Sequence, residues 1–232
     1  MPIIRQIIRF VNCEKCKKGQ AIFVKTYKIY LIRHGMTEAN DKGLYVGKRD
    51  LPLSPSGLTH LLKMRESFDY PSARRFYAAP QLRCRQTLEV LYPGCDVTDA
   101  PGLQECDFGE FEGRSSVQLR SDEAFRRWAT GESNEIPGGE SADAFQYRVM
   151  QGFEALVKEI LKSGETENVL CLPGGVQMMV LAAYGLPRLQ MREWAADSGC
   201  GFALRITPEL WMREPVAEAL CAIPWEKEEQ KN

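Results

Sequence analysis

Short runs of β-branched, aromatic and aliphatic residues alternate along this chain with longer segments in which apolar residues recur every three or four positions. The short runs are typical of buried strands, and the longer segments of helices that turn one face to a core. The expected strands are residues 27–32, 75–79, 169–172, 202–206 and 217–223. Residues 54–57 are expected to open the first helix. Further helices are expected over residues 81–91, 123–129, 142–161 and 176–184.

Strands that alternate with helices predict an α/β fold, a three-layer α/β/α sandwich with a mainly parallel central sheet. Residues 24–232 are expected to form one domain, from which the Gly-, Glu-, Ser- and Pro-rich residues 107–140 make a long excursion. Such sheets bind ligands at the carboxyl ends of their strands. The segments that follow Ile32, Ala79 and Leu172 are therefore the places to look for a site.

The composition narrows the class of protein. The chain has 232 residues, of which 44% are hydrophobic and 26% charged, and its formal net charge is −1. These values are typical of a globular protein and exclude collagen-like, disordered and coiled-coil classes. A balanced charge gives no electrostatic reason to expect nucleic acid, and no apolar run approaches the roughly 18 residues that span a bilayer. Neither nucleic acid nor a membrane is expected as a partner, and no pattern indicates the oligomeric state.

The eight cysteines are expected to be free thiols, because a chain of this length can form a stable hydrophobic core without disulfide bonds. The first 20 residues include Arg5 and Arg9 and lack the apolar core of a secretory signal, so a cytoplasmic location is expected. Cys13 and Cys16 form a lone C-x-x-C pair. A zinc knuckle or a redox pair there is an alternative to two incidental thiols.

Residues 1–23 are interpreted as an N-terminal extension outside the domain. Residues 1–28 carry seven basic side chains against the single acid Glu14. A solvated extension, a segment that lies on anionic membranes and a translation start at Val24 are all compatible with this pattern. We expect deletion of residues 1–23 to leave the thermal midpoint nearly unchanged.

Three segments carry residues suited to chemistry. The first strand ends in Arg33-His34-Gly35, the second leads into a helix that begins with Arg83 and Arg85, and Glu105 opens a loop rich in acids, aromatics and glycine. Two residues apart on a helix, Arg83 and Arg85 cannot both face one site. An imidazole can attack phosphorus, guanidinium groups can hold its oxygens, and a carboxylic acid can protonate the leaving alkoxide. Together they suit phosphoryl transfer.

From about Tyr27 to Ile206 the sequence resembles the histidine phosphatase (phosphoglycerate mutase-like) superfamily, because five motif segments occur in the family's order. The matching residues are Arg33, His34, Gly35, Thr37 and Asn40 in R-H-G-x-T-x-x-N; Tyr45, Gly47, Asp50, Pro52, Leu53, Ser54 and Gly57 in the next segment; Arg83, Gln86 and Thr87 in a partly retained S-x-L-x-R-A-x-Q-T pattern; Leu103, Glu105, Gly109, Glu112 and Gly113; and residues 137–141 with Arg148. Tyr45 and Gly47 and the moderate length look more like the phosphatase branch, including α-ribazole phosphatases.

The resemblance implies a role for each of these site residues. His34 would be the nucleophile that becomes phosphohistidine, Arg33 and Arg83 would grip the phosphate, and Glu105 would protonate the leaving group. Further substrate contacts would come from Asn40, Gly47 and the backbone N–H groups of Gly174 and Gly175. The resemblance implies neither a metal nor a cofactor, and the expected ligand is a small phosphate ester.

One family segment is altered. Where members carry a second catalytic histidine in V-x-H-G-[GS], residues 169–175 place Pro173, which has neither an imidazole nor an N–H. His60, on the first helix, is expected to be structural, and the reach of Gln177 is not readable from the sequence. The leading interpretation is a phosphomonoesterase with reduced activity. The alternatives are a catalytically degenerate module that binds a phosphorylated ligand and, more weakly, a mutase, which is disfavoured because the basic segment used for bisphosphates has no clear match.

Overall fold

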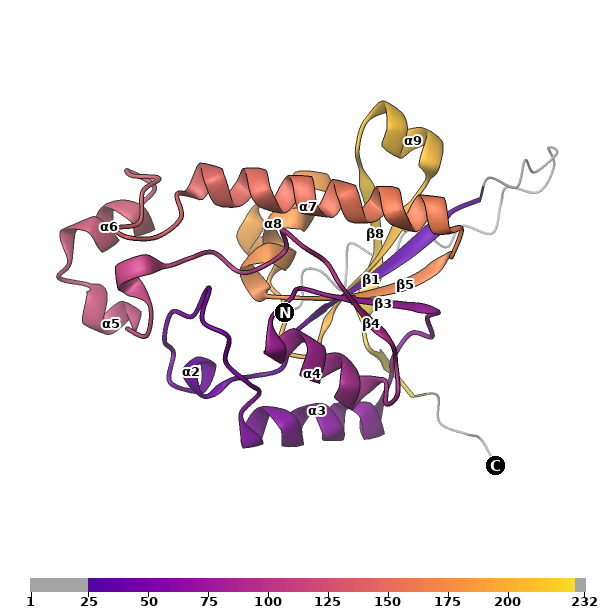
Figure 1. Cartoon of the computed structure of the whole chain (residues 1–232), viewed down its shortest axis with the longest axis horizontal. Coiled ribbons are helices and arrows are strands. Elements are labelled where there is room, and N and C mark those ends of the chain that lie inside the picture. Colours follow the sequence, from indigo (N-terminus) through magenta and orange to yellow (C-terminus); the bar gives the residue numbers. More distant parts are fainter. Residues whose placement is uncertain (1–24, 228–232) are drawn as a thin grey trace.

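A computed structural model describes residues 25–227, which fold around one large sheet (Figure 1). Across this part of the chain the sheet has seven strands. In spatial order they are β4 (Val97–Asp99), β3 (Arg75–Ala78), β5 (Glu167–Leu172), β1 (Tyr27–Arg33), β7 (Gly201–Ile206), β8 (Ala217–Ile223) and β6 (Gly185–Leu186). Neighbouring strands are parallel except where β7 pairs with β1 and with β8. The expected mainly parallel sheet is confirmed.

Helices cover both faces of this sheet, as Figure 1 shows. α3 (Pro55–Ser67) and α4 (Leu82–Leu91) lie on one side, and α7 (Ala142–Ser163) and α8 (Gly174–Tyr184) lie on the other. The shorter helices are α2 (Glu38–Asp41), α5 (Ser116–Leu119), α6 (Glu123–Ala129) and α9 (Pro208–Arg213), with 3-10 turns at Gly109–Phe111 and Met191–Trp194. β2 (Phe68–Asp69) and β9 (Trp225–Glu226) form a separate antiparallel pair. The three-layer arrangement is the one predicted.

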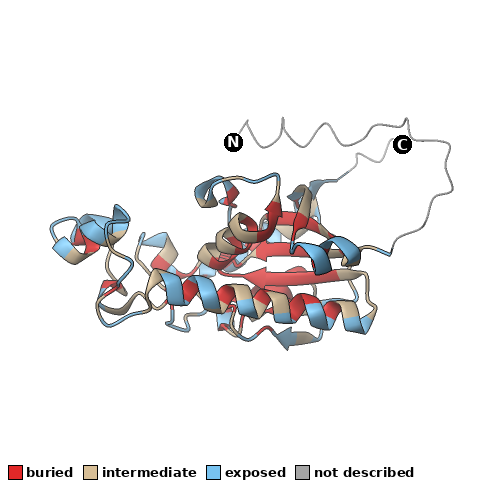
Figure 2. Cartoon of the chain, turned by 90° about the horizontal axis from the view of Figure 1, so that it is seen from above, coloured by how far each residue is buried: buried red, intermediate tan, exposed pale blue. Residues whose placement is uncertain are grey.

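The core follows the apolar pattern of the sequence. In Figure 2 the central strands are buried, and the outer faces of the helices are exposed. α7 buries residues at the spacing expected from the sequence, from Phe145 to Ile160, and it ends at Gly164, whose φ of 76° is left-handed. On α4 the sequence makes Leu82, Cys84, Leu88 and Leu91 available to the core; Cys84, Leu88 and Leu91 are buried, as this predicts, but the prediction is wrong for Leu82, which is 39% exposed. Leu82 precedes Cys84 by two positions and therefore lies on the opposite side of the helix.

Local sequence fixes the segments nearest the sheet's carboxyl edge. Thr37 caps α2, and its side chain and backbone bond to Asn40 in a reciprocal capping box. Ser54 caps α3 by accepting from Gly57 N, and Pro55 occupies the first turn. The excursion at residues 107–140 is held by an aromatic cluster in which Trp128 contacts Tyr45, Phe108, Phe111 and Phe125. These contacts give the loops a defined shape.

Several expectations lie partly or wholly outside the described residues. The 1–23 extension and the Cys13–Cys16 pair fall outside them, so both remain predictions, as do the outer limits of the 24–232 domain. The six cysteines within residues 25–227 are free thiols, as expected. Across the same residues, none of the helices combines the length and the apolarity that crossing a bilayer requires.

Candidate active site

His34 lies directly after β1, where the backbone of the central strands holds it. Its N–H donates to the Leu172 carbonyl of β5 at 3.0 Å, and its side chain is buried. The next residue, Gly35, donates its N–H to Thr87 Oγ1 of α4 at 2.9 Å. A Cβ at Gly35 would lie 2.6 Å from Leu61 Cδ1, so this close approach of β1 to α3 requires glycine. The backbone that carries the imidazole is therefore fixed by the neighbouring strand β5 and by α4.

The ring of His34 has a defined protonation state. Nδ1 lies 2.6 Å from the Gly35 carbonyl oxygen, which can only accept, so Nδ1 carries the proton. The lone pair is then on Nε2, which accepts from Arg83 Nε at 3.2 Å. Burial, followed by the charge of Arg83, lowers the pKa of His34 to about 3. The imidazole is therefore neutral at ordinary pH, and a neutral imidazole can act as a nucleophile.

Arg83 and Arg85 separate as the helical spacing predicts. Arg83 is 1% exposed, and besides His34 it donates from Nη1 to the Arg49 carbonyl at 2.9 Å and from Nη2 to the Gly47 carbonyl at 3.1 Å. Arg85 lies on the outer face of α4 and pairs with Asp99. The site therefore receives one guanidinium from this helix, already bonded to the protein on each of its nitrogens.

Glu105 faces the same place from the loop after β4. Its Oε1 accepts from Cys106 N at 3.0 Å and its Oε2 from Gly175 N at 2.9 Å, at the N-terminus of α8. Burial raises the pKa of the Glu105 carboxyl despite these donors and the neighbouring arginines. A Cβ on Gly175 would lie 2.4 Å from Glu105 Oε1, so the contact needs glycine there. A carboxyl with a raised pKa can act as a proton donor.

A cavity of about 150 Å³ brings most of the predicted residues together. Its lining consists of Arg33, His34, Asn40, Val46, Glu105, Gly174, Gly175, Gln177, Met178, Ala195 and Ala196. Arg33 donates from Nη1 to the Ala196 carbonyl at 2.7 Å, while its buried Nε has no partner. Asn40 accepts from Thr37 with Oδ1, which leaves its Nδ2 donor for a ligand. The result is a small chamber lined by hydrogen-bond donors, a neutral imidazole and a carboxyl group.

Two predicted substrate-binding residues lie behind this chamber. Gly47 is absent from the cavity lining. Its backbone groups are also occupied, since the N–H donates to Glu112 Oε1 and the carbonyl accepts from Gln81 and Arg83. Arg83 likewise lies against the back of His34 and contributes no lining atom. Gly174 lines the cavity, whereas the Gly175 N–H is occupied by Glu105. Gly47 and Arg83 remain proposals as phosphate contacts, and Arg83 could reach a phosphate only after a rearrangement of its side chain.

The altered segment sits at the rim of the chamber. Pro173 caps α8 with φ −62° and contributes nothing to the cavity lining. His60 is exposed on α3 and is also absent from that lining. Gln177, whose reach the sequence left open, is 1% exposed and lines the cavity, and its Oε1 is buried without a partner. The sequence signal for Gln177 was a polar side chain among the apolar residues of α8, and such a residue is a candidate for a site.

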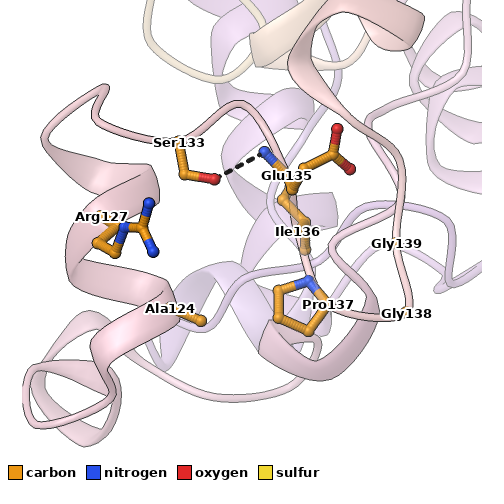
Figure 3. A pocket seen from close by; sticks show the side chains of 8 residues that line it. All are labelled: Ala124, Arg127, Ser133, Glu135, Ile136, Pro137, Gly138 and Gly139. Atoms are coloured by element: carbon orange, nitrogen blue, oxygen red, sulfur yellow. Dashed lines mark hydrogen bonds between the residues drawn. The ribbon is translucent and has the colours of Figure 1, made fainter.

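Larger cavities lie elsewhere and lack this chemistry. One of about 430 Å³ lies in the 107–140 excursion (Figure 3). There Arg127 comes from α6, and the Ser133 side chain accepts from Glu135 N at 3.2 Å. None of the residues predicted for catalysis lines it. Within residues 25–227, no three His, Cys, Asp or Glu side chains gather as a metal site would require.

Comparison with known proteins gives three consistent findings. The sequence profile of the Histidine phosphatase superfamily (branch 1) matches residues 29–214. Adenosylcobalamin/alpha-ribazole phosphatase of Salmonella typhimurium is 27% identical over 186 residues (77% of this chain, 90% of the relative), and the probable phosphoglycerate mutase GpmB of an Enterobacter species is 29% identical over 177 residues (71% and 80%). The crystal structure of the alpha-ribazole phosphatase from Shigella flexneri superposes with a TM-score of 0.70 at 25% identity and covers 86% of this chain and 96% of its own.

Proposed function

The chain belongs to the histidine phosphatase superfamily, and we propose that it hydrolyses small phosphomonoesters through a phosphohistidine at His34. One observation carries this proposal. The Nδ1–H of His34 is held by the Gly35 carbonyl, which leaves a neutral, cavity-lining imidazole whose lone pair is on Nε2, where it accepts from Arg83. A buried imidazole fixed in this tautomer is suited to attack phosphorus.

In the first step, His34 Nε2 forms a bond to phosphorus while the bond from phosphorus to the ester oxygen breaks. Glu105 transfers its proton to that oxygen, so the alcohol leaves neutral and Glu105 becomes a carboxylate. The guanidinium of Arg33, the Nδ2 donor of Asn40 and the helix terminus at Gly174 are placed to bind the phosphoryl oxygens. Arg83 joins them once it releases His34.

In the second step, a water molecule attacks phosphorus and the bond to Nε2 breaks. The Glu105 carboxylate takes the proton from that water, which restores the acid and releases inorganic phosphate. His34 returns to its neutral form with Nδ1 still bonded to Gly35. The same carboxyl group therefore serves as acid and then as base, and the step needs no further group.

The substrate class follows from the chamber and its relatives. Arg33 is the only lysine or arginine that lines the cavity within the described chain, which suits one phosphoryl group better than two. The similarity to proteins named alpha-ribazole phosphatase supports hydrolysis, and Val46 and Met178 give an apolar wall for the leaving group. The six free cysteines of residues 25–227 support a cytoplasmic location.

A second candidate is a phosphate-binding module with little turnover. Pro173 favours it, because this residue offers no donor to the phosphoryl group where relatives are expected to have an imidazole. The hydrogen bonds of Arg83 favour the binding module as well, because all three guanidinium nitrogens already donate within the protein and must exchange these partners before the side chain can hold a phosphate.

Hydrolysis of p-nitrophenyl phosphate at mildly acidic to neutral pH separates the two candidates. We expect turnover by the wild type, none by His34→Ala, and unchanged turnover by His60→Ala, which alters the chain's other, exposed histidine. Phosphate binding without turnover in the wild type would instead establish the binding module. Equal activity in His34→Ala would exclude His34 as the nucleophile.

A further inference from the structure

We propose that the side-chain amide of Gln177 binds the phosphoryl group in the His34 chamber and supplies a donor that Pro173 cannot. This inference rests on the proposed function and adds a phosphoryl-binding residue to it. Gln177 is 1% exposed, and neither its Oε1 nor its Nε2 makes a hydrogen bond to another residue of the described chain. Enclosing an amide in this way costs free energy that a bound ligand would recover.

The helix directs this amide toward the altered position. Gln177 is four residues after Pro173 and donates its own N–H to the Pro173 carbonyl at 2.9 Å. Side chains on a helix lean toward its N-terminus and cover the preceding turn. The amide therefore lies over the Pro173–Gly174 turn, on the side of α8 that faces the chamber, as its place in the cavity lining shows.

A second unpartnered group lines the same chamber. The Nε of Arg33 is buried without a partner, and a Cβ added to Gly174 would lie 3.1 Å from it. The guanidinium therefore lies against the same helical turn that the Gln177 amide covers. One buried donor and one buried amide face a cavity that also holds the nucleophile.

A tetrahedral oxyanion satisfies both groups. One oxygen accepts from Arg33 Nε–H, and a neighbouring oxygen accepts from Gln177 Nε2–H after the amide turns its nitrogen to the ligand. An amide can present either end, because its oxygen and nitrogen occupy equivalent positions about the last side-chain bond. The negative charge strengthens both bonds relative to those of a neutral ligand.

Sulfate is the probe for binding, because it is a tetrahedral dianion that does not titrate between pH 4 and 8. Calorimetry would compare the full-length wild type with Gln177→Leu, Gln177→Glu and Met179→Leu, the last a control on α8 outside the cavity lining. We expect Gln177→Leu to weaken sulfate binding about tenfold or more, as for a lost hydrogen bond to a charged group, and Met179→Leu to leave it unchanged. The kcat/KM for p-nitrophenyl phosphate should fall in parallel.

Gln177→Glu keeps the size of the side chain and separates binding from packing. Its carboxylate should repel the anion at pH 7 and repel it less near pH 4, so its sulfate affinity relative to the wild type should recover in acid. A purely structural role would give no such dependence. Sulfate affinity equal to that of the wild type in both Gln177 variants would overturn the inference, even if His34-dependent turnover stands. Binding that depends on Gln177 without any wild-type turnover would instead retain the inference and remove the phosphatase.

Discussion

The Nε of Arg83 donates to the Nε2 of His34 across 3.2 Å, so the arginine occupies the lone pair with which the histidine would attack phosphorus. The other two guanidinium nitrogens donate to the Arg49 and Gly47 carbonyls. In this arrangement Arg83 keeps the imidazole neutral and oriented. Under the proposed mechanism, we expect an incoming phosphoryl group to take over the Arg83 donor and so free Nε2 for attack.

Replacement of Arg83 by lysine tests the importance of its bond to His34. A lysine ammonium lacks the planar fork that reaches His34 and two carbonyls together, so we expect kcat/KM for p-nitrophenyl phosphate to fall about 10²-fold. Arg85→Lys is the matched control two residues along α4, where the side chain pairs with Asp99 on the surface. Steady-state kinetics on both variants should show a loss for Arg83→Lys alone. Similar losses in both would point to a general disturbance of α4 rather than to the bond between Arg83 and His34.

The pH dependence of kcat/KM reports the acid and the nucleophile. The proposed mechanism requires a neutral His34, whose pKa is lowered to about 3, and a protonated Glu105, whose pKa is raised by burial. The rate should therefore rise as pH increases through about 3 and fall as pH passes above the ordinary range of a glutamic acid. With an alkyl phosphate, whose leaving group needs a proton, Glu105→Gln should be slow and lack the alkaline limb. A wild-type rate that keeps rising above neutral pH would contradict Glu105 as the acid.

Pro173→His should raise the phosphatase activity, because it returns a donor to the charge that develops on phosphorus. One such donor is worth about 10²-fold in rate. Pro173→Ala is the control, since it restores a backbone N–H at the start of α8 without adding an imidazole. Kinetics of both variants should show a gain for histidine that exceeds any gain for alanine. Equal rates in the two variants would show that another group, such as Gln177, already provides what the histidine would add.

The elements that the sequence predicted are those with a strong apolar signature. The spacing in α7 and the runs in β1 and β5 set which faces are buried, and helical periodicity separated Arg83 from Arg85. The sequence did not predict β4 because, at the edge of the sheet, Val97 is only half-buried and the other two residues are exposed. Its pairing with β3 depends on backbone groups that every residue carries.

The residues of the candidate site likewise fall into those that the sequence could identify and those that it could not. His34, Arg33 and Glu105 could be named because their residue types and order suit phosphoryl transfer, and the chamber brings them together. The burial of Gln177 depends on how α8 docks beside β1, and the contacts of Arg83 depend on loop carbonyls at Gly47 and Arg49. Such tertiary relationships leave no periodicity in the sequence.

The covalent intermediate is the most direct test of the account. Rapid acid-free quenching of the protein with a phosphate ester, followed by mass spectrometry of the intact chain and its peptides, would detect one added phosphoryl group. We predict that this group is on His34, is labile to acid, accumulates in Pro173→His no less than in the wild type, and is absent from His34→Ala. Turnover of the ester with no phosphoryl group on His34, or with the group on another residue, would contradict the central claim.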